Sequence, residues 1–153
     1  MSTLEARLES RFLSPEELSI SAKEFLALCE VLKMLEQGRL EHSYVEHDEA
    51  PTQVGFNMNI PAERDSCGTI CCIGGWASVI MQGGLRDEKG HYQFDGYTAC
   101  LYVDRSLGDL RDLYYPPIGF DWDGITPAHA SRALRNFLTT GRPDWETVCA
   151  DLL

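Results

Sequence analysis

The chain has 153 residues, of which 13 are Lys or Arg and 24 are Asp or Glu, so its formal net charge at pH 7 is -11. A hydrophobic fraction of 44% argues against a disordered chain, and the length suits one domain with its own core. The acidic balance argues against direct binding to nucleic-acid phosphates or to an anionic membrane, because both require clustered Lys and Arg. It favours a protein partner with a basic surface.

The sequence gives no sign of export or of membrane insertion. No stretch reaches the roughly 18 consecutive apolar residues of a spanning helix. The first ten residues are acidic and amphipathic, unlike a secretory signal peptide. The six cysteines are therefore expected as thiols in a reducing compartment, and we predict a cytoplasmic protein without a metal or cofactor.

The first third of the chain is predicted to be helical. Helix starts are expected at Ser2 with Glu5, at Ser14-Pro15-Glu16-Glu17, and at Ser21 with Glu24. After the last start, apolar residues at helical spacing predict a helix over residues 22–37, which Gly38 ends.

Residues 39–65 are less regular. Val54 to Ile60 alternate weakly between apolar and polar and form either a short strand or an extended loop. The acidic run that precedes them, residues 41–49, is interpreted as a solvated loop. A metal site using His42 and His47 is the alternative there, although no known ligand spacing supports it.

The most distinctive stretch has no charged residue between Asp65 and Arg86. A helix that is apolar on all sides must be buried, so residues 68–82 are predicted to form the central helix. Gly74 and Gly75 each cost about 1 kcal/mol of helix propensity, which suggests that close packing requires them.

Further helices are predicted after a turn or small hairpin over residues 85–96. They cover residues 97–103, residues 107–114, a segment from Thr126-Pro127 to Gly141, and a last short segment capped by Asp144. The predicted fold is a single all-α or nearly all-α domain over residues 1–153. It has five to seven helices around residues 68–82, with a small β-hairpin attached from residues near 54–60 and 91–94.

Cys67 is the strongest candidate for chemistry, because it precedes a predicted buried helix whose N-terminus would stabilise a thiolate. A catalytic cysteine also needs a base, for which His91 and His129, or His42 and His47, are the candidates. The alternative function is therefore a cysteine-dependent hydrolase or acyl transferase with Cys67 as nucleophile. A zinc site using Cys67, Cys71 and Cys72 is disfavoured, because a second ligand pair is missing.

One motif resembles that of a family of small bacterial and phage proteins with no assigned activity: Cys67-Gly68-Thr69-x-x-Cys72-Ile73-x-Gly75-Trp76-Ala77. Further motifs of that family are matched here by Phe56-Asn57-Met58, Leu107-Gly108, Tyr114-Tyr115-Pro116, and Thr126-Pro127-x-x-Ala130 through Leu134 to Thr140-Gly141-x-x-Asp144-Trp145. The resemblance spans roughly residues 54–146 and implies a compact, mostly helical domain. Family members often carry Asp where this chain has Asn57, which weakens any role for a carboxylate there.

The motif is predicted to be structural rather than catalytic. Its members are Cys67, Gly68, Thr69, Cys72, Gly75 and Trp76. We expect Cys67, Cys72 and Trp76 to be buried, and Gly75 to let another backbone approach beside Trp76. The predicted function is a non-enzymatic, acidic protein-binding protein. One form would be a phage-encoded inhibitor of a host nucleic-acid-binding system, which mimics nucleic acid and occupies the site meant for DNA or RNA.

Overall fold

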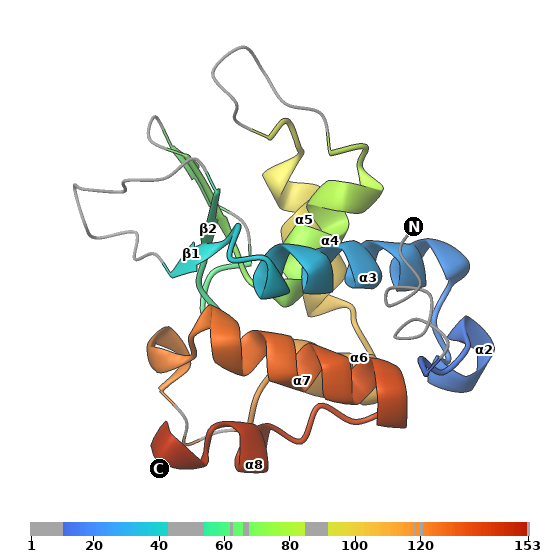
Figure 1. The fold of residues 1–153 in the computed structure, drawn as a ribbon. Coiled ribbons are helices and arrows are strands. Elements are labelled where there is room, and N and C mark those ends of the chain that lie inside the picture. Colours follow the sequence, from blue (N-terminus) through green and yellow to red (C-terminus); the bar gives the residue numbers. More distant parts are fainter. Residues whose placement is uncertain are drawn as a thin grey trace.

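The computed structural model describes residues 11–42, 54–61, 63–65, 68–84, 92–117, 119 and 121–152. The predicted helix start at Ser2, together with Cys67 and His91, lies outside these residues. The described α-helices are α2 (Pro15–Leu18), α3 (Ala22–Glu36), α4 (Ile73–Met81), α5 (Gly96–Asp104), α6 (Gly108–Tyr114), α7 (Pro127–Thr140) and α8 (Trp145–Val148) (Figure 1). Two 3-10 turns, η1 (Trp122–Gly124) and η2 (Ala150–Leu152), accompany them.

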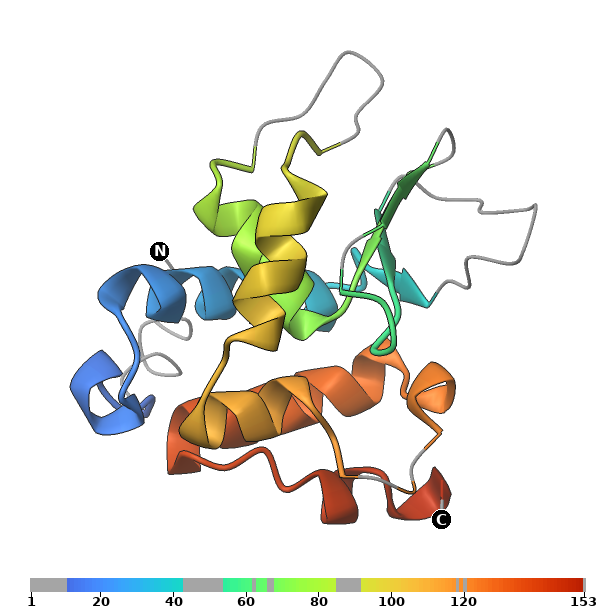
Figure 2. The same cartoon turned by 180° about the vertical axis from the view of Figure 1, so that it is seen from behind.

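Helix α3 lies across the middle of the molecule, with α4 and α5 on one side and α7 on the other (Figures 1 and 2). Helices α6 and α8 both lie against α7, with Tyr114 at the end of α6 also reaching Gly74 of α4, and a small sheet flanks the α3–α4 crossing. None of the described helices is long and apolar enough to cross a membrane.

The sheet has four strands in the order β1 (Glu41–His42), β2 (Val54–Phe56), β4 (Gly68–Cys71) and β3 (Glu63–Asp65). Strand β2 pairs in parallel with both β1 and β4, and β3 pairs antiparallel with β4. The prediction of a mostly helical domain is confirmed, but the fold is not all-α. The predicted hairpin does not form at β2, because β1 and β4 occupy both of its edges. Of residues 91–94, His91 lies outside the described residues and Tyr92 forms an isolated bridge.

The central helix is shorter than predicted. Residues 68–71 form β4, Cys72 is the N-cap, and α4 begins only at Ile73. Every residue from Ile73 to Val79 is buried, so this segment is central as expected. The error has a physical cause, since a short apolar run fits a buried strand and a buried helix equally well.

The predicted helix boundaries with strong capping signals are confirmed. Ser14 and Ser21 each accept a bond from the third helical N–H of α2 and α3, at 3.1 and 3.0 Å. At the other end of α3, Gly38 is left-handed, and the Arg39 N–H donates to the Met34 carbonyl at 3.0 Å. The boundaries of α7 also match, from the Thr126 cap to left-handed Gly141.

Asp144 stands at the N-cap position of α8 as predicted, but its side chain makes no capping bond. Its backbone is left-handed, with φ of 55°, instead of the extended conformation that N-cap residues usually adopt.

Candidate functional site: the Cys72–Trp76 motif and an acidic groove

The motif residues within the described part of the chain form the joint between sheet and helices. Cys72 is buried, and its Sγ accepts the Gly75 N–H at 3.3 Å, so the thiol takes the place of a serine or aspartate cap. Burial raises the pKa of the Cys72 thiol to about 11, although its bond with Gly75 acts in the opposite direction. Cys72 therefore remains a neutral thiol at physiological pH.

Trp76 is fully buried and connects α4 to the sheet. Its indole N–H donates to the Gly55 carbonyl of β2 at 2.8 Å, and its ring meets the edge of Tyr92 at 5.0 Å between centroids. Beside it, a Cβ on Gly75 would collide with the carbonyl of Pro61. The predicted burial of Cys72 and Trp76 is confirmed, and so is the close backbone approach at Gly75. Cys67 lies outside the described residues.

Asn57 supports the same joint through the turn after β2. Asn57 is buried. Its side-chain Oδ1 accepts the Asn59 N–H at 2.8 Å, and its backbone N–H donates to the Cys71 carbonyl at 3.3 Å. A second bond closes the turn onto α4, since the Cys72 N–H donates to the Ile60 carbonyl at 2.7 Å. The amide has a structural role that the sequence pattern alone did not indicate.

The candidate base His129 is buried and fully engaged in a structural cluster. The Thr126 N–H donates to His129 Nδ1 at 3.0 Å, so this nitrogen carries no proton and Nε2–H donates to Asp151 at 3.0 Å. This bond holds the pKa of the Asp151 carboxyl below its usual range. His129 thus completes the capping box of α7 and ties the C-terminal turn to it. The pairing of Cys67 with His91 or His129 stays a prediction.

No three His, Cys, Asp or Glu side chains among the described residues are grouped so that they could hold a metal ion. Cys71 and Cys72 are both buried at the strand-to-helix joint. His47 and Cys67, two members of the metal sites weighed from the sequence, lie outside the described residues.

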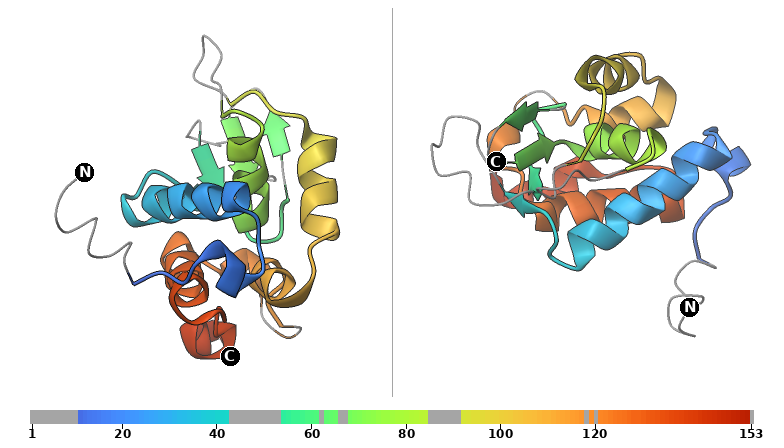
Figure 3. Two further views of the ribbon diagram at one scale, coloured as in Figure 1. Left: turned by 90° about the vertical axis from the view of Figure 1, so that its right-hand side faces the viewer. Right: turned by 90° about the horizontal axis from the view of Figure 1, so that it is seen from above.

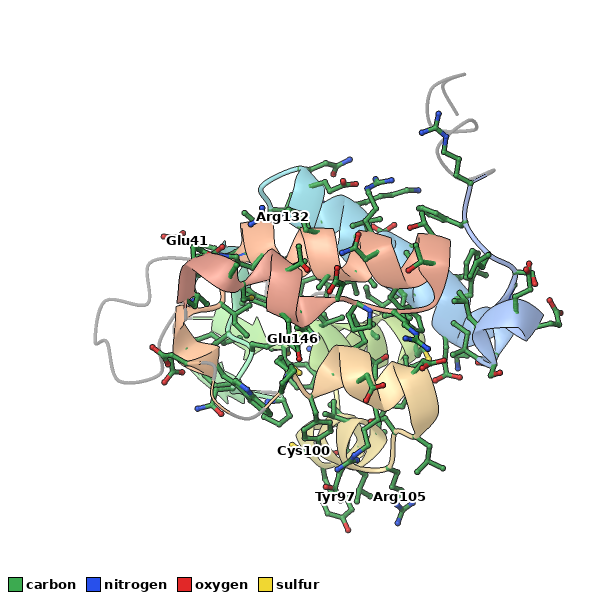
Figure 4. All side chains as sticks on the ribbon, turned by 90° about the horizontal axis from the view of Figure 1, so that it is seen from below. Glu41, Tyr97, Cys100, Arg105, Arg132 and Glu146 are labelled. Carbon is green, nitrogen blue, oxygen red and sulfur yellow. The ribbon has the colours of Figure 1, made fainter. Side chains whose placement is uncertain are left out.

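A separate hollow lies between α6, the end of α7 and α8. It has a volume of about 750 Å³, and four carboxylates line it: Asp109, Asp112, Asp144 and Glu146. Arg142 contributes the only guanidinium to its lining. Seen from below, Glu146 lies between α8 and α6 (Figure 4). Within the described part of the chain, none of the four carboxylates forms a salt bridge. We call this hollow the acidic groove.

Hydrogen bonds from side chains to backbone carbonyls hold the walls of the acidic groove together. The buried Trp145 donates its indole N–H to the Asp112 and Leu113 carbonyls at 3.0 and 3.2 Å, which joins α8 to the end of α6. Asn136 of α7 donates to the Pro143 carbonyl at 3.0 Å and fixes the connecting segment. The two segments that carry the carboxylates are therefore joined by hydrogen bonds. No family model, curated protein or solved structure matches the chain.

Proposed function

We propose that the protein is a non-enzymatic interaction protein that binds a basic surface of a protein partner through the acidic groove. The observation that supports this most is the convergence on one hollow of about 750 Å³ of four carboxylates from two separate segments, none of which forms a salt bridge with a described residue. The net charge of -11 adds a long-range attraction for a cationic partner.

The groove suits Lys and Arg side chains for a physical reason. Four carboxylates around one hollow repel one another, and a single guanidinium, Arg142, offsets only part of that repulsion. A cationic side chain entering the groove replaces repulsion with attraction. One such pair at 4 Å near a protein surface interacts by about 4 kcal/mol before desolvation costs. Rapid, salt-sensitive association is the expected signature.

A nucleic-acid-binding protein of a bacterial host is the partner class we propose, with this chain acting as a phage-encoded inhibitor. Such a partner carries Lys and Arg where phosphates would bind. Other described acids come from α2, α3, α5 and η1 as well. The proposed mimicry therefore rests on the acidic groove rather than on one continuous acidic face.

The test compares two variants with the same net charge. Asp109→Asn/Asp112→Asn/Glu146→Gln neutralises the groove, while Glu16→Gln/Glu30→Gln/Glu41→Gln removes three charges from other elements. Each protein is titrated with a synthetic decapeptide rich in Arg and Lys, followed by amide chemical shifts. Each is also used for affinity capture from a bacterial lysate.

We expect the wild type and the second variant to bind the peptide with shifts around the acidic groove, and to retain a basic protein from lysate. Binding should vanish near 1 M salt, where the Debye length is about 3 Å. The groove variant should bind at least about tenfold more weakly, a change of about 1.4 kcal/mol. Equal weakening in both variants would contradict the proposal, because net charge alone would then explain binding.

A further inference from the structure

The outer side of α5 carries a row of side chains that the described residues leave exposed or half-buried. Tyr97 is 73% exposed, and the half-buried Leu101 and the exposed C-cap residue Arg105 follow it at four-residue spacing, so the three side chains lie along one side of the helix. Figure 4 shows Tyr97 and Arg105 projecting outward from α5. Leu107, just beyond the helix, is 79% exposed. We call these four residues the α5 stripe.

The stripe borders a second hollow of about 480 Å³. The hollow lies between α5, the start of α6 and the turn that leads into α3, three segments that Figure 3 shows side by side. Leu101, Leu107 and Leu110 contribute its apolar walls. Exposed apolar side chains grouped beside a hollow are typical of a protein interface.

Leu107 is an unfavourable residue for the fold itself. It occupies the N-cap of α6 without any side-chain capping bond, at a position where Ser, Thr, Asp or Asn would bind a free N–H. A highly exposed leucine at a cap position gains nothing from the chain's own core. Such a local departure from good capping marks a functional surface.

The charged groups around the hollow indicate what covers it. Both oxygens of Glu24 are occupied, one by the Ser21 N–H at 3.0 Å and the other by the Tyr102 hydroxyl at 2.8 Å. Arg105 forms no salt bridge within the described residues. Along α5 itself, the stripe thus has an exposed aromatic ring at one end, a half-buried leucine in the middle and an exposed guanidinium at the other end.

The order of these side chains on one copy is complementary to the same order on a second copy that runs in the opposite direction. When two α5 helices pack antiparallel about a two-fold axis at Leu101, each Tyr97 ring meets the guanidinium of the other copy's Arg105. We propose that the α5 stripe is the interface of a homodimer. The dimer does not depend on the function of the acidic groove, but it would present two acidic grooves to one partner and so increase avidity.

Sedimentation velocity across a concentration series tests the dimer. The wild type should move from a mass of 17.2 kDa toward twice that value as concentration rises. Added salt should strengthen the association, because it screens repulsion between two copies of charge -11. This salt response is opposite to that expected for the acidic groove, so the two proposals can fail independently.

Three single variants complete the test. Tyr97→Glu should weaken dimerisation by at least about tenfold. Leu107→Ser should do the same while supplying the missing cap of α6, so loss of the dimer cannot be attributed to unfolding. Leu26→Ser is the matched control: Leu26 is 68% exposed on α3, two residues from Glu24 and so on the opposite side of that helix. A wild type that stays at 17.2 kDa at every concentration overturns the proposal, as does an equal effect of Leu26→Ser.

Discussion

At the scale of single residues, Cys72 has the buried, structural role that was predicted for it, and its thiol stays protonated at physiological pH. Its position before a buried helix is the kind of place where a thiolate forms. Its complete burial acts more strongly, and the pKa of the thiol rises to about 11. The sulfur acts instead as a hydrogen-bond acceptor for Gly75.

This raised pKa predicts a loss of stability at alkaline pH. Because the folded thiol has a higher pKa than the unfolded one, near 9.0, its contribution is complete below pH 9 and is lost as the pH rises toward about 11. In Cys72→Ser the hydroxyl keeps an acceptor at the cap but does not titrate. The unfolding free energy of the wild type relative to this variant should therefore fall by about 1.4 kcal/mol per pH unit above pH 9.

Denaturant titrations of both proteins at pH 8, 9 and 10 measure this difference. The comparison cancels the buried tyrosines, since Tyr102 and Tyr114 also have raised pKa values and are present in both proteins. A difference that stays constant from pH 8 to pH 10 would show that Cys72 is already accessible to water.

At the scale of elements, the helices were predictable where capping residues mark their ends, but of the sheet only β2 lies in a segment that was expected to be a strand or a loop. Ser21, Glu24 and Gly38 all lie within one turn of the ends of α3, so the local sequence contains both of its boundaries. Strand β4 depends on pairing with β2, whose residues lie 15 positions earlier, as in the pair Val54 and Thr69. Helical periodicity does not reveal a strand partner that is distant in the sequence. The sequence therefore predicts a helix for the residues that form β4.

The contact between α4 and the chain at Pro61 predicts a large difference between two adjacent glycines. At Gly75 a Cβ would collide with the Pro61 carbonyl, a backbone atom that the Cys72–Ile60 bond holds near α4. Gly75→Ala should cost about 3 kcal/mol despite better helix propensity. At Gly74 the nearest atoms belong to side chains rather than to backbone, Val103 Cγ2 at 2.8 Å and the Tyr114 ring at 3.0 Å. Gly74→Ala should cost about 1–2 kcal/mol.

Gly96→Ala is the matched control for these two variants. Gly96 is the first residue of α5, and a Cβ there would have no neighbour closer than 4.0 Å. This variant should be neutral or slightly stabilising. Thermal unfolding of the three variants should therefore rank Gly75→Ala lowest, and a reversed order of Gly74→Ala and Gly75→Ala would refute the assigned contact.

At the scale of the whole molecule, the net charge was evident in the sequence but the acidic groove was not. Its carboxylates belong to two segments more than 30 residues apart, α6 with Asp109 and Asp112, and the stretch with Asp144 and Glu146. The packing of Trp145 against the end of α6 brings the two together. That contact is a long-range property of the fold, so the sequence indicated a basic partner without indicating where it would bind.

Trp76 connects the sheet to the helices, so its loss should affect both parts together. Trp76→Ala should cost about 3–5 kcal/mol, a large part of the 5–15 kcal/mol typical of a whole domain. Trp76→Phe keeps an aromatic ring for Tyr92 but loses the bond to the Gly55 carbonyl, which then stays buried without its donor. We expect it to cost less, about 1–3 kcal/mol. Far-UV and near-UV circular dichroism should report one coincident transition in Trp76→Phe, shifted to lower denaturant. Separate transitions, with helical signal persisting after aromatic signal is lost, would mean that the helices fold without the sheet and that Trp76 does not couple them.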